Sequence, residues 1–176
     1  MIWLSNSTVS RLRDQLRLRG QRASVPVSVV TGESDATDAE FGAMVARYGA
    51  MCETMFLMMS ADGNISTEER DVVAGALRTL SEDSIRSAHI EAMLDRAIHA
   101  LADEGRDARL KGVVAELVRD PARAEVAFVL AAAVAFADGA IADEENDTLS
   151  LLADGLGIGE TRVNELLDGV EADRLR

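Results

Sequence analysis

The sequence predicts an all-α fold, a single bundle of about seven helices with an internal pseudo-two-fold repeat. Its 176 residues include only two prolines, four phenylalanines, one tryptophan and one tyrosine. Residues that lose little free energy on entering a helix, such as Ala, Leu, Glu and Arg, are plentiful. Apolar residues recur every three or four positions over most of the chain, as on the buried face of a helix. An acid-rich segment also occurs twice, which predicts two similar helical hairpins packed against each other.

Length and charge exclude several classes of protein. Hydrophobic residues make up 48% of the chain, which is enough for one core and excludes wholesale disorder. The chain has 18 basic and 31 acidic side chains and a net charge of −13, so we expect no nucleic-acid partner, because binding to phosphates requires Lys and Arg. The single cysteine, Cys52, can form neither an internal disulfide nor a thiolate metal site, which favours a cytoplasmic location.

Residues 1–34 differ in charge and composition from the rest of the chain. We expect them to form an N-terminal extension and linker before a domain over residues 35–176. Five arginines and one acid lie among the first 24 residues, after a short apolar start. Val9, Leu12 and Leu16 would share one face of a helix with arginines around it. Such a face predicts either packing on the domain or on a partner, or weak association of residues 1–24 with anionic lipid at the periphery of the inner membrane.

The first helix of the domain is expected to begin at Thr37. Thr37 and Glu40 have the spacing of a capping box, and apolar residues then recur at helical spacing from Phe41 to Met59. Pro121 suits the first turn of a later helix and Gly105 suits a break between two helices. The remaining helices are expected at residues 66–80, 84–104, 106–119, 121–137, 142–157 and 159–168.

The internal repeat is the most informative pattern in the chain. Residues 61–71 (ADGNISTEERD) recur 76 positions later as residues 137–147 (ADGAIADEEND), with seven of eleven positions identical. We call these segments the first and second acidic turns. Each predicts the end of one helix, a tight Asp-Gly turn in which glycine takes a positive φ, an isoleucine anchor and a new helix with acids in its first turn.

These residues resemble the TerB-like tellurite-resistance family, whose domain also occurs at the N-terminus of some membrane-anchored J-domain co-chaperones. The resemblance covers residues 38–168 and includes the paired Asp-Gly turns, the apolar helix leading into the second turn, and the closing Leu156-Gly157-Ile158. It implies a compact all-α bacterial domain tied to tellurite or other chemical stress, with acidic residues that hold metal ions and no known catalytic reaction. Asp62 and Asp138 match the turn aspartates.

The resemblance also assigns Glu69 and Glu145 to the glutamates that follow the turns. If the two turns lie side by side, Asp62, Glu69, Asp138 and Glu145 would form one metal site. Carboxylate oxygens suit a divalent cation, and Ca²⁺, Mg²⁺, Mn²⁺ and Zn²⁺ all remain open. A calcium-sensor EF-hand is excluded, because its first two acidic positions are occupied here by apolar residues or serine.

The competing interpretation is that the acids stabilise helix starts. Ser66 and Glu69 have the spacing of a capping box, and acids in a first turn suit the positive end of a helix. In the second turn the cap position is Ala142, which cannot accept a hydrogen bond through its side chain. Asp143 would then serve as a shifted cap.

No nucleophile and base occur in a recognisable catalytic pattern, so we expect no enzyme. The sequence favours a non-catalytic acidic binding or sensing module that holds a divalent cation or a protein partner with a basic surface. The alternative is a membrane-associated or co-chaperone-like interaction scaffold with no metal. A metal-assisted hydrolase is a third hypothesis.

Overall fold

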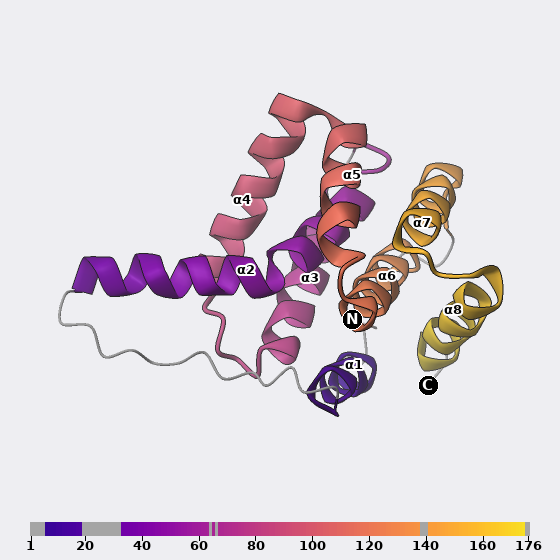
Figure 1. Cartoon of the computed structure of the whole chain (residues 1–176), viewed down its shortest axis with the longest axis horizontal. Coiled ribbons are helices and arrows are strands. Elements are labelled where there is room, and N and C mark those ends of the chain that lie inside the picture. Colours follow the sequence, from indigo (N-terminus) through magenta and orange to yellow (C-terminus); the bar gives the residue numbers. More distant parts are fainter. Residues whose placement is uncertain (1–5, 19–32, 64, 66, 138–140, 175–176) are drawn as a thin grey trace.

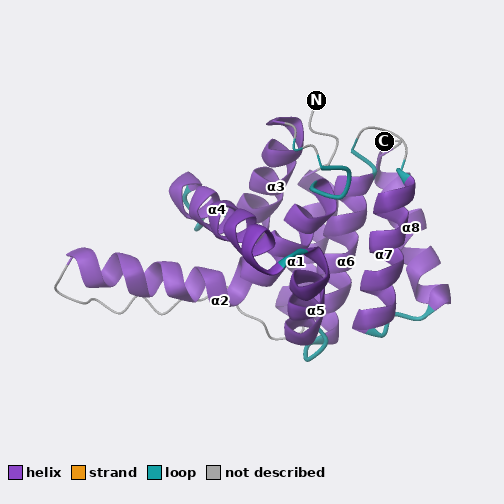
Figure 2. Cartoon of the chain, turned by 90° about the horizontal axis from the view of Figure 1, so that it is seen from above, coloured by secondary structure: helices purple, strands orange, loops and turns teal. Residues whose placement is uncertain are grey.

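The computed structural model describes residues 6–18, 33–63, 65, 67–137 and 141–174. These parts of the chain contain eight helices and no strand (Figure 2). The helices are α1 (Asn6–Leu18), α2 (Glu33–Met59), α3 (Thr67–Leu80), α4 (Ser87–Glu104), α5 (Arg106–Leu117), α6 (Pro121–Ala135), α7 (Asp143–Leu156) and α8 (Glu160–Arg174).

The seven helices expected from the sequence correspond to α2 through α8, and α1 is an additional one. The expected start of the first of them was wrong, because Thr37 lies inside α2, which begins four residues earlier at Glu33. A capping-box spacing is only a local signal, and residues 33–36 contain no proline or glycine that would prevent the helix from beginning at Glu33. The N-terminal end of α2 projects beyond the other helices at the left of Figure 1.

Helix α6 is the centre of the bundle. Ala124 and every residue from Val126 to Ala135 are buried. Alanines and valines let the backbones of neighbouring helices approach closely, and α6 packs against α1, α2, α3, α5, α7 and α8 (Figure 1). Its start is fixed by Asp120, whose carboxylate accepts hydrogen bonds from the backbone N–H groups of Ala122 and Arg123, and by Pro121 in the first turn.

Helix α1 lies in the segment expected to be an extension, yet it packs against α3, α6 and α8. Val9 and Leu12 are only 2% and 4% exposed and belong to the core. Arg11 extends this contact through an ion pair of 2.8 Å with Asp173 on α8. Val9 and Leu12 therefore pack on the domain, which is one of the two outcomes expected for this face. None of the described helices combines the length and hydropathy that crossing a bilayer requires.

The break between α2 and α3 has the geometry that the Asp-Gly motif predicts. Gly63 has a φ of +83°, and its N–H donates to the carbonyl of Ser60 at 3.2 Å. Gly105, with a φ of +82°, separates α4 from α5 as expected. Both positions need the left-handed backbone that glycine adopts without strain.

Candidate functional site

Three of the four predicted metal ligands can be placed in the structure. Asp62 is exposed in the turn after α2, while Glu69 and Glu145 are half-buried in the first turns of α3 and α7. Each of these three has a polar or ionic contact within the protein. Asp138, the fourth, lies outside the described residues.

Glu145 has a local role at the start of α7. The backbone N–H of Ala142 donates to its Oε2 at 2.8 Å, which is the half of a capping box that an alanine at the cap position still permits. Ala142 is the cap and Asp143 is the first helical residue, so the shifted cap expected at Asp143 was wrong. The cap interpretation therefore accounts for Glu145. Ser66, the counterpart of Ala142 in the first turn, lies outside the described residues.

Arg106 connects the flanks of the two acidic turns. Its Nη1 donates to Ser60 Oγ at 3.3 Å, and its Nη2 donates to Thr148 Oγ1 at 2.9 Å. Ser60 lies two residues before Asp62, and Thr148 lies three residues after Glu145 on α7. One guanidinium at the start of α5 thus holds the end of α2 beside the beginning of α7.

The charge on Arg106 is partly withdrawn from water. The side chain is half-buried, and this burial lowers its pKa, while the nearby carboxylate of Asp107 acts in the opposite direction. Sequence reasoning missed Arg106 as a bridge. The available signal was its position directly after Gly105, in the stretch that separates the two copies of the repeat. Within the described residues, no three His, Cys, Asp or Glu side chains gather closely enough to hold a metal ion.

Comparison with known protein families identifies the family to which the chain belongs. Residues 49–167 match the family described as tellurite resistance protein TerB. The chain belongs to the TerB family. No curated protein and no solved structure matches the chain.

The matched range of the TerB family contains both acidic turns, Arg106 and the whole of α3 to α7. Helix α1 and the N-terminal part of α2 lie outside it. The family match and the core therefore have different boundaries, because α1 contributes buried side chains to the bundle without being part of the matched segment.

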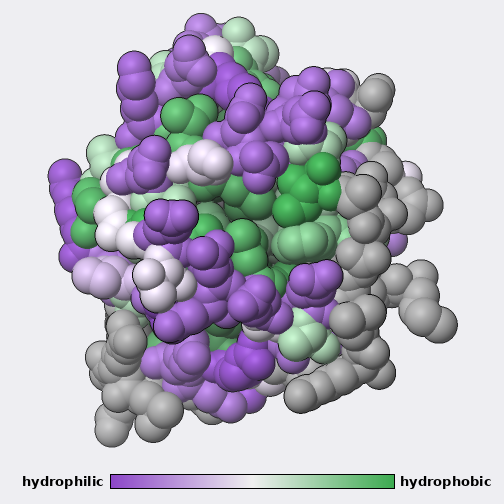
Figure 3. Space-filling model, turned by 90° about the vertical axis from the view of Figure 1, so that its right-hand side faces the viewer, coloured by the Kyte–Doolittle hydropathy of each residue, from purple (hydrophilic) through white to green (hydrophobic). Residues whose placement is uncertain are grey.

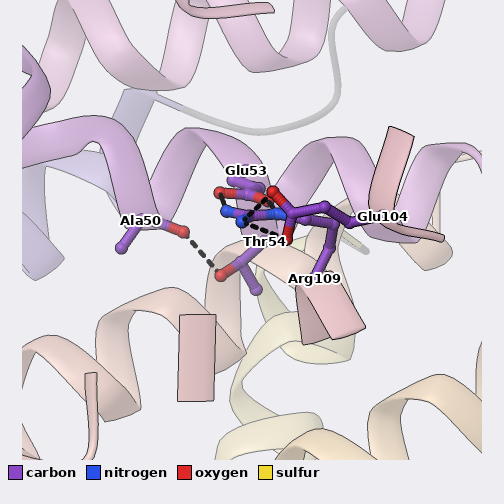
Figure 4. Close-up of polar contacts among 5 residues, drawn as sticks. All are labelled: Ala50, Glu53, Thr54, Glu104 and Arg109. Atoms are coloured by element: carbon purple, nitrogen blue, oxygen red, sulfur yellow. Dashed lines mark hydrogen bonds and ion pairs between the residues drawn. The ribbon is translucent and has the colours of Figure 1, made fainter. Parts of the chain in front are cut away.

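A second polar cluster of the TerB domain lies one turn further along α5 (Figure 4). Arg109 donates through Nε and Nη2 to the two carboxylate oxygens of Glu53, at 2.6 and 2.8 Å. Its Nη1 donates to both carboxylate oxygens of Glu104, at 3.3 and 3.1 Å. These bonds raise the pKa of Arg109 further above its already high value. Arg109 therefore ties α5 to both α2 and α4 through charge-assisted bonds.

A cavity of about 230 Å³ adjoins this cluster between α2, α4 and α5. Its lining combines apolar and small side chains with five charged ones. These are Val45, Gly49, Ala50, Glu53, Met93, Arg96, Ala97, Ala100, Glu104, Arg109 and Glu116. This cavity could not be predicted from the sequence, because its lining residues come from three separate helices.

Proposed function

We propose that this TerB-family chain is a non-catalytic binding module that takes up a divalent cation, or a basic protein partner, at the end of the bundle that carries the acidic turns. The observation that supports it is the Arg106 contact to both Ser60 and Thr148, which draws the flanks of the two turns together. The sequence repeat alone does not require the two acidic turns to lie close together. We also propose a cytoplasmic location, in keeping with the single buried cysteine.

The distribution of charge favours a cationic ligand at this end. Helix α7 has five acidic residues and no basic one, and Asp143, Glu144 and Asp147 are exposed. Ionised carboxylates that lie close together repel one another, and a bound cation relieves this repulsion. Hard divalent cations take several oxygen ligands, so the two turns together offer the chemistry that neither offers alone.

The proposed ligands are Asp62, Glu69, Asp138 and Glu145. The hydrogen bond from Ala142 to Glu145 is compatible with this role, because a carboxylate has about four lone-pair sites across its two oxygens and the backbone N–H takes one. The same capping bond fixes the orientation of the side chain. A ligand that is already oriented loses less conformational entropy when a cation binds.

An interaction scaffold without metal is the second candidate, and one feature of the surface favours it. The face on which α7 and α8 lie has a hollow of apolar side chains bordered by hydrophilic ones (Figure 3). Leu151 on α7 is 57% exposed. Apolar surface rimmed by polar groups is typical of protein-binding sites.

Thermal unfolding of the full chain tests the metal proposal. With saturating Ca²⁺, Mg²⁺, Mn²⁺ or Zn²⁺ the melting temperature should rise for at least one cation, because a ligand selective for the folded state stabilises it. Asp62→Asn and Asp138→Asn should lose this gain, and in metal-free buffer they should be neutral or slightly stabilising.

The control is Asp95→Asn, which removes an exposed carboxylate from the middle of α4 and should keep the full gain. If no cation shifts the melt of the unmodified chain, the metal site is wrong. The acidic turns would then act as helix caps and as a surface for a basic partner.

A further inference from the structure

The cavity between α2, α4 and α5 is distinct from the acidic turns. It exists because small residues meet where α2 and α4 pack together, namely Gly49 and Ala50 on α2 and Ala97 and Ala100 on α4. Their side chains do not fill the space between the helices. Its volume of about 230 Å³ is several times the roughly 30 Å³ that one water occupies in the liquid.

The walls of this cavity are held in place. Arg109 binds Glu53 with two parallel hydrogen bonds and reaches Glu104 with a third nitrogen, so the three helices are cross-linked at one end of the cavity (Figure 4). Glu53 is only 15% exposed, which protects these bonds from solvent. A preformed cavity with a few fixed polar groups is the usual form of a small-ligand site.

The polar part of the lining favours a cationic ligand. It contains three carboxylates, those of Glu53, Glu104 and Glu116, against the guanidiniums of Arg96 and Arg109. Glu116 also forms an ion pair of 4.0 Å with Arg123, which does not line the cavity. Three nitrogens of Arg109 already donate to carboxylates, which leaves it little capacity for an anion. Glu104 and Glu116 are 52% and 51% exposed, so their oxygens can be reached from solvent.

We propose that this cavity binds an aliphatic primary ammonium group. The alkyl chain would lie against Val45, Ala50, Met93 and Ala97, and the ammonium would donate to the carboxylates at the rim. An ammonium has three donors and no acceptor, and each carboxylate has about four lone-pair sites. Glu53 and Glu104, which already accept from Arg109, therefore retain sites that can accept from an ammonium. The net charge of −13 also raises the local concentration of cations around the protein.

Two sources offer this chemistry, a free alkylamine or diamine and the lysine side chain of a partner protein. A lysine stem packs on apolar surface while its ammonium stays at polar groups. The proposal does not depend on the acidic turns, and its test can be run with the turns free of metal.

The test is a titration of the full chain with pentylamine in buffer containing EDTA. Binding is measured by isothermal titration calorimetry and by changes in amide NMR chemical shifts. Saturable binding is expected, with shifts at α2, α4 and α5. Three parallel titrations distinguish the possible ligands. 1,5-Diaminopentane represents a free diamine, and a blocked lysine (N-acetyl-lysine methylamide) represents the lysine side chain of a partner protein. Pentanoate has a similar alkyl chain with the opposite charge.

Two variants give the contrast. Ala97→Leu fills the cavity and should weaken pentylamine binding at least tenfold, whereas Ala92→Leu adds the same side chain at an exposed position of α4 and should leave it unchanged. Glu116→Gln keeps the shape, removes one carboxylate and should weaken binding several-fold, which covers the case in which Ala97→Leu fails to fold.

Three results would overturn the proposal. These are preferential binding of pentanoate, equal affinity of Ala97→Leu and the unmodified chain, and no binding of any amine. Because the buffer chelates divalent cations, none of these results bears on the metal proposed for the acidic turns.

Discussion

Two arginines three residues apart on α5 make different connections. Arg106 joins the end of α2 to α7 through hydroxyl groups, and Arg109 joins α2 to α4 through carboxylates. Side chains three positions apart on a helix point about 60° from each other. Arg106 and Arg109 therefore reach different neighbouring helices from adjacent turns of α5. A guanidinium suits both tasks because its donors lie in a fixed planar fork.

Cys52 provides a prediction about alkaline pH. The thiol is 1% exposed, and burial raises its pKa from about 9 to about 12. Below pH 9 the thiol is protonated in both the folded and the unfolded chain, so its full contribution to stability is present. Above pH 9 the unfolded chain ionises first, and stability is lost as the pH rises towards 12.

Between pH 8 and 10.5 the unmodified chain should therefore lose more free energy of unfolding than Cys52→Ala, by about 2 kcal/mol. Urea unfolding at the two pH values measures this difference. Other groups, such as Tyr48, whose pKa burial also raises, contribute equally to both proteins. Equal losses in the two proteins would show that Cys52 does not titrate in this way.

The sequence predicted the backbone of the first acidic turn, where the signal was local. The positive φ of Gly63 follows from the Asp-Gly motif. The bond from the Ala142 N–H to Glu145 was not predicted, because attention fell on the side chain at the cap position, which an alanine lacks, and not on its backbone donor. The bridge made by Arg106 could not be predicted, because it depends on two partners that are 46 and 42 residues away in the chain. Such contacts are set by how the helices pack and leave no pattern of their own.

At the scale of elements, the contact between α5 and α7 depends on a glycine. A Cβ added at Gly155 would lie 2.9 and 3.0 Å from the two methyl carbons of Val114. Valine in a helix has one strongly preferred rotamer and cannot easily turn aside. The absence of a side chain at residue 155 therefore lets α7 lie close to α5.

Gly155→Ala should destabilise the protein by about 1 kcal/mol or more, because the overlap exceeds the gain in helix propensity. The matched substitution Gly112→Ala, on the other side of α5, meets only the Arg109 guanidinium at 3.8 Å. It should stabilise by about 0.5–1 kcal/mol, since alanine is favoured in a helix interior. Thermal or urea unfolding compares the two, and effects of the same sign would contradict this account.

Helix positions were predictable to within a few residues for α3 to α7, because turn residues such as Gly105 and Pro121 bound a strong apolar periodicity. The last helix was predicted to end at residue 168, but α8 continues for six more residues to Arg174. Helix α1 was recognised only as a basic segment with one apolar face. Its buried residues Val9 and Leu12 are few, and the surrounding arginines dominate its composition. Whether such a short apolar face packs on its own domain depends on the apolar surface that the other helices leave uncovered, which the sequence of α1 does not reveal.

On the scale of the whole molecule, α1 is expected to stabilise the bundle. Leu12→Ala should lower the free energy of unfolding by about 2–4 kcal/mol, as expected for truncating a buried leucine. Gln15→Ala, at an exposed position of the same helix, should change it by less than about 0.5 kcal/mol. Urea unfolding measures both. A small effect of Leu12→Ala would mean that α1 is detached from the bundle in solution.

The central position of α6 has a consequence for protein synthesis. Helix α2 ends at residue 59, but α6, against which it packs, begins only at residue 121. During translation the first half of the chain therefore leaves the ribosome with a large apolar surface uncovered. Nascent chains in this condition bind chaperones or associate with one another. Completion of α6 is thus the event that lets the nascent chain bury its core.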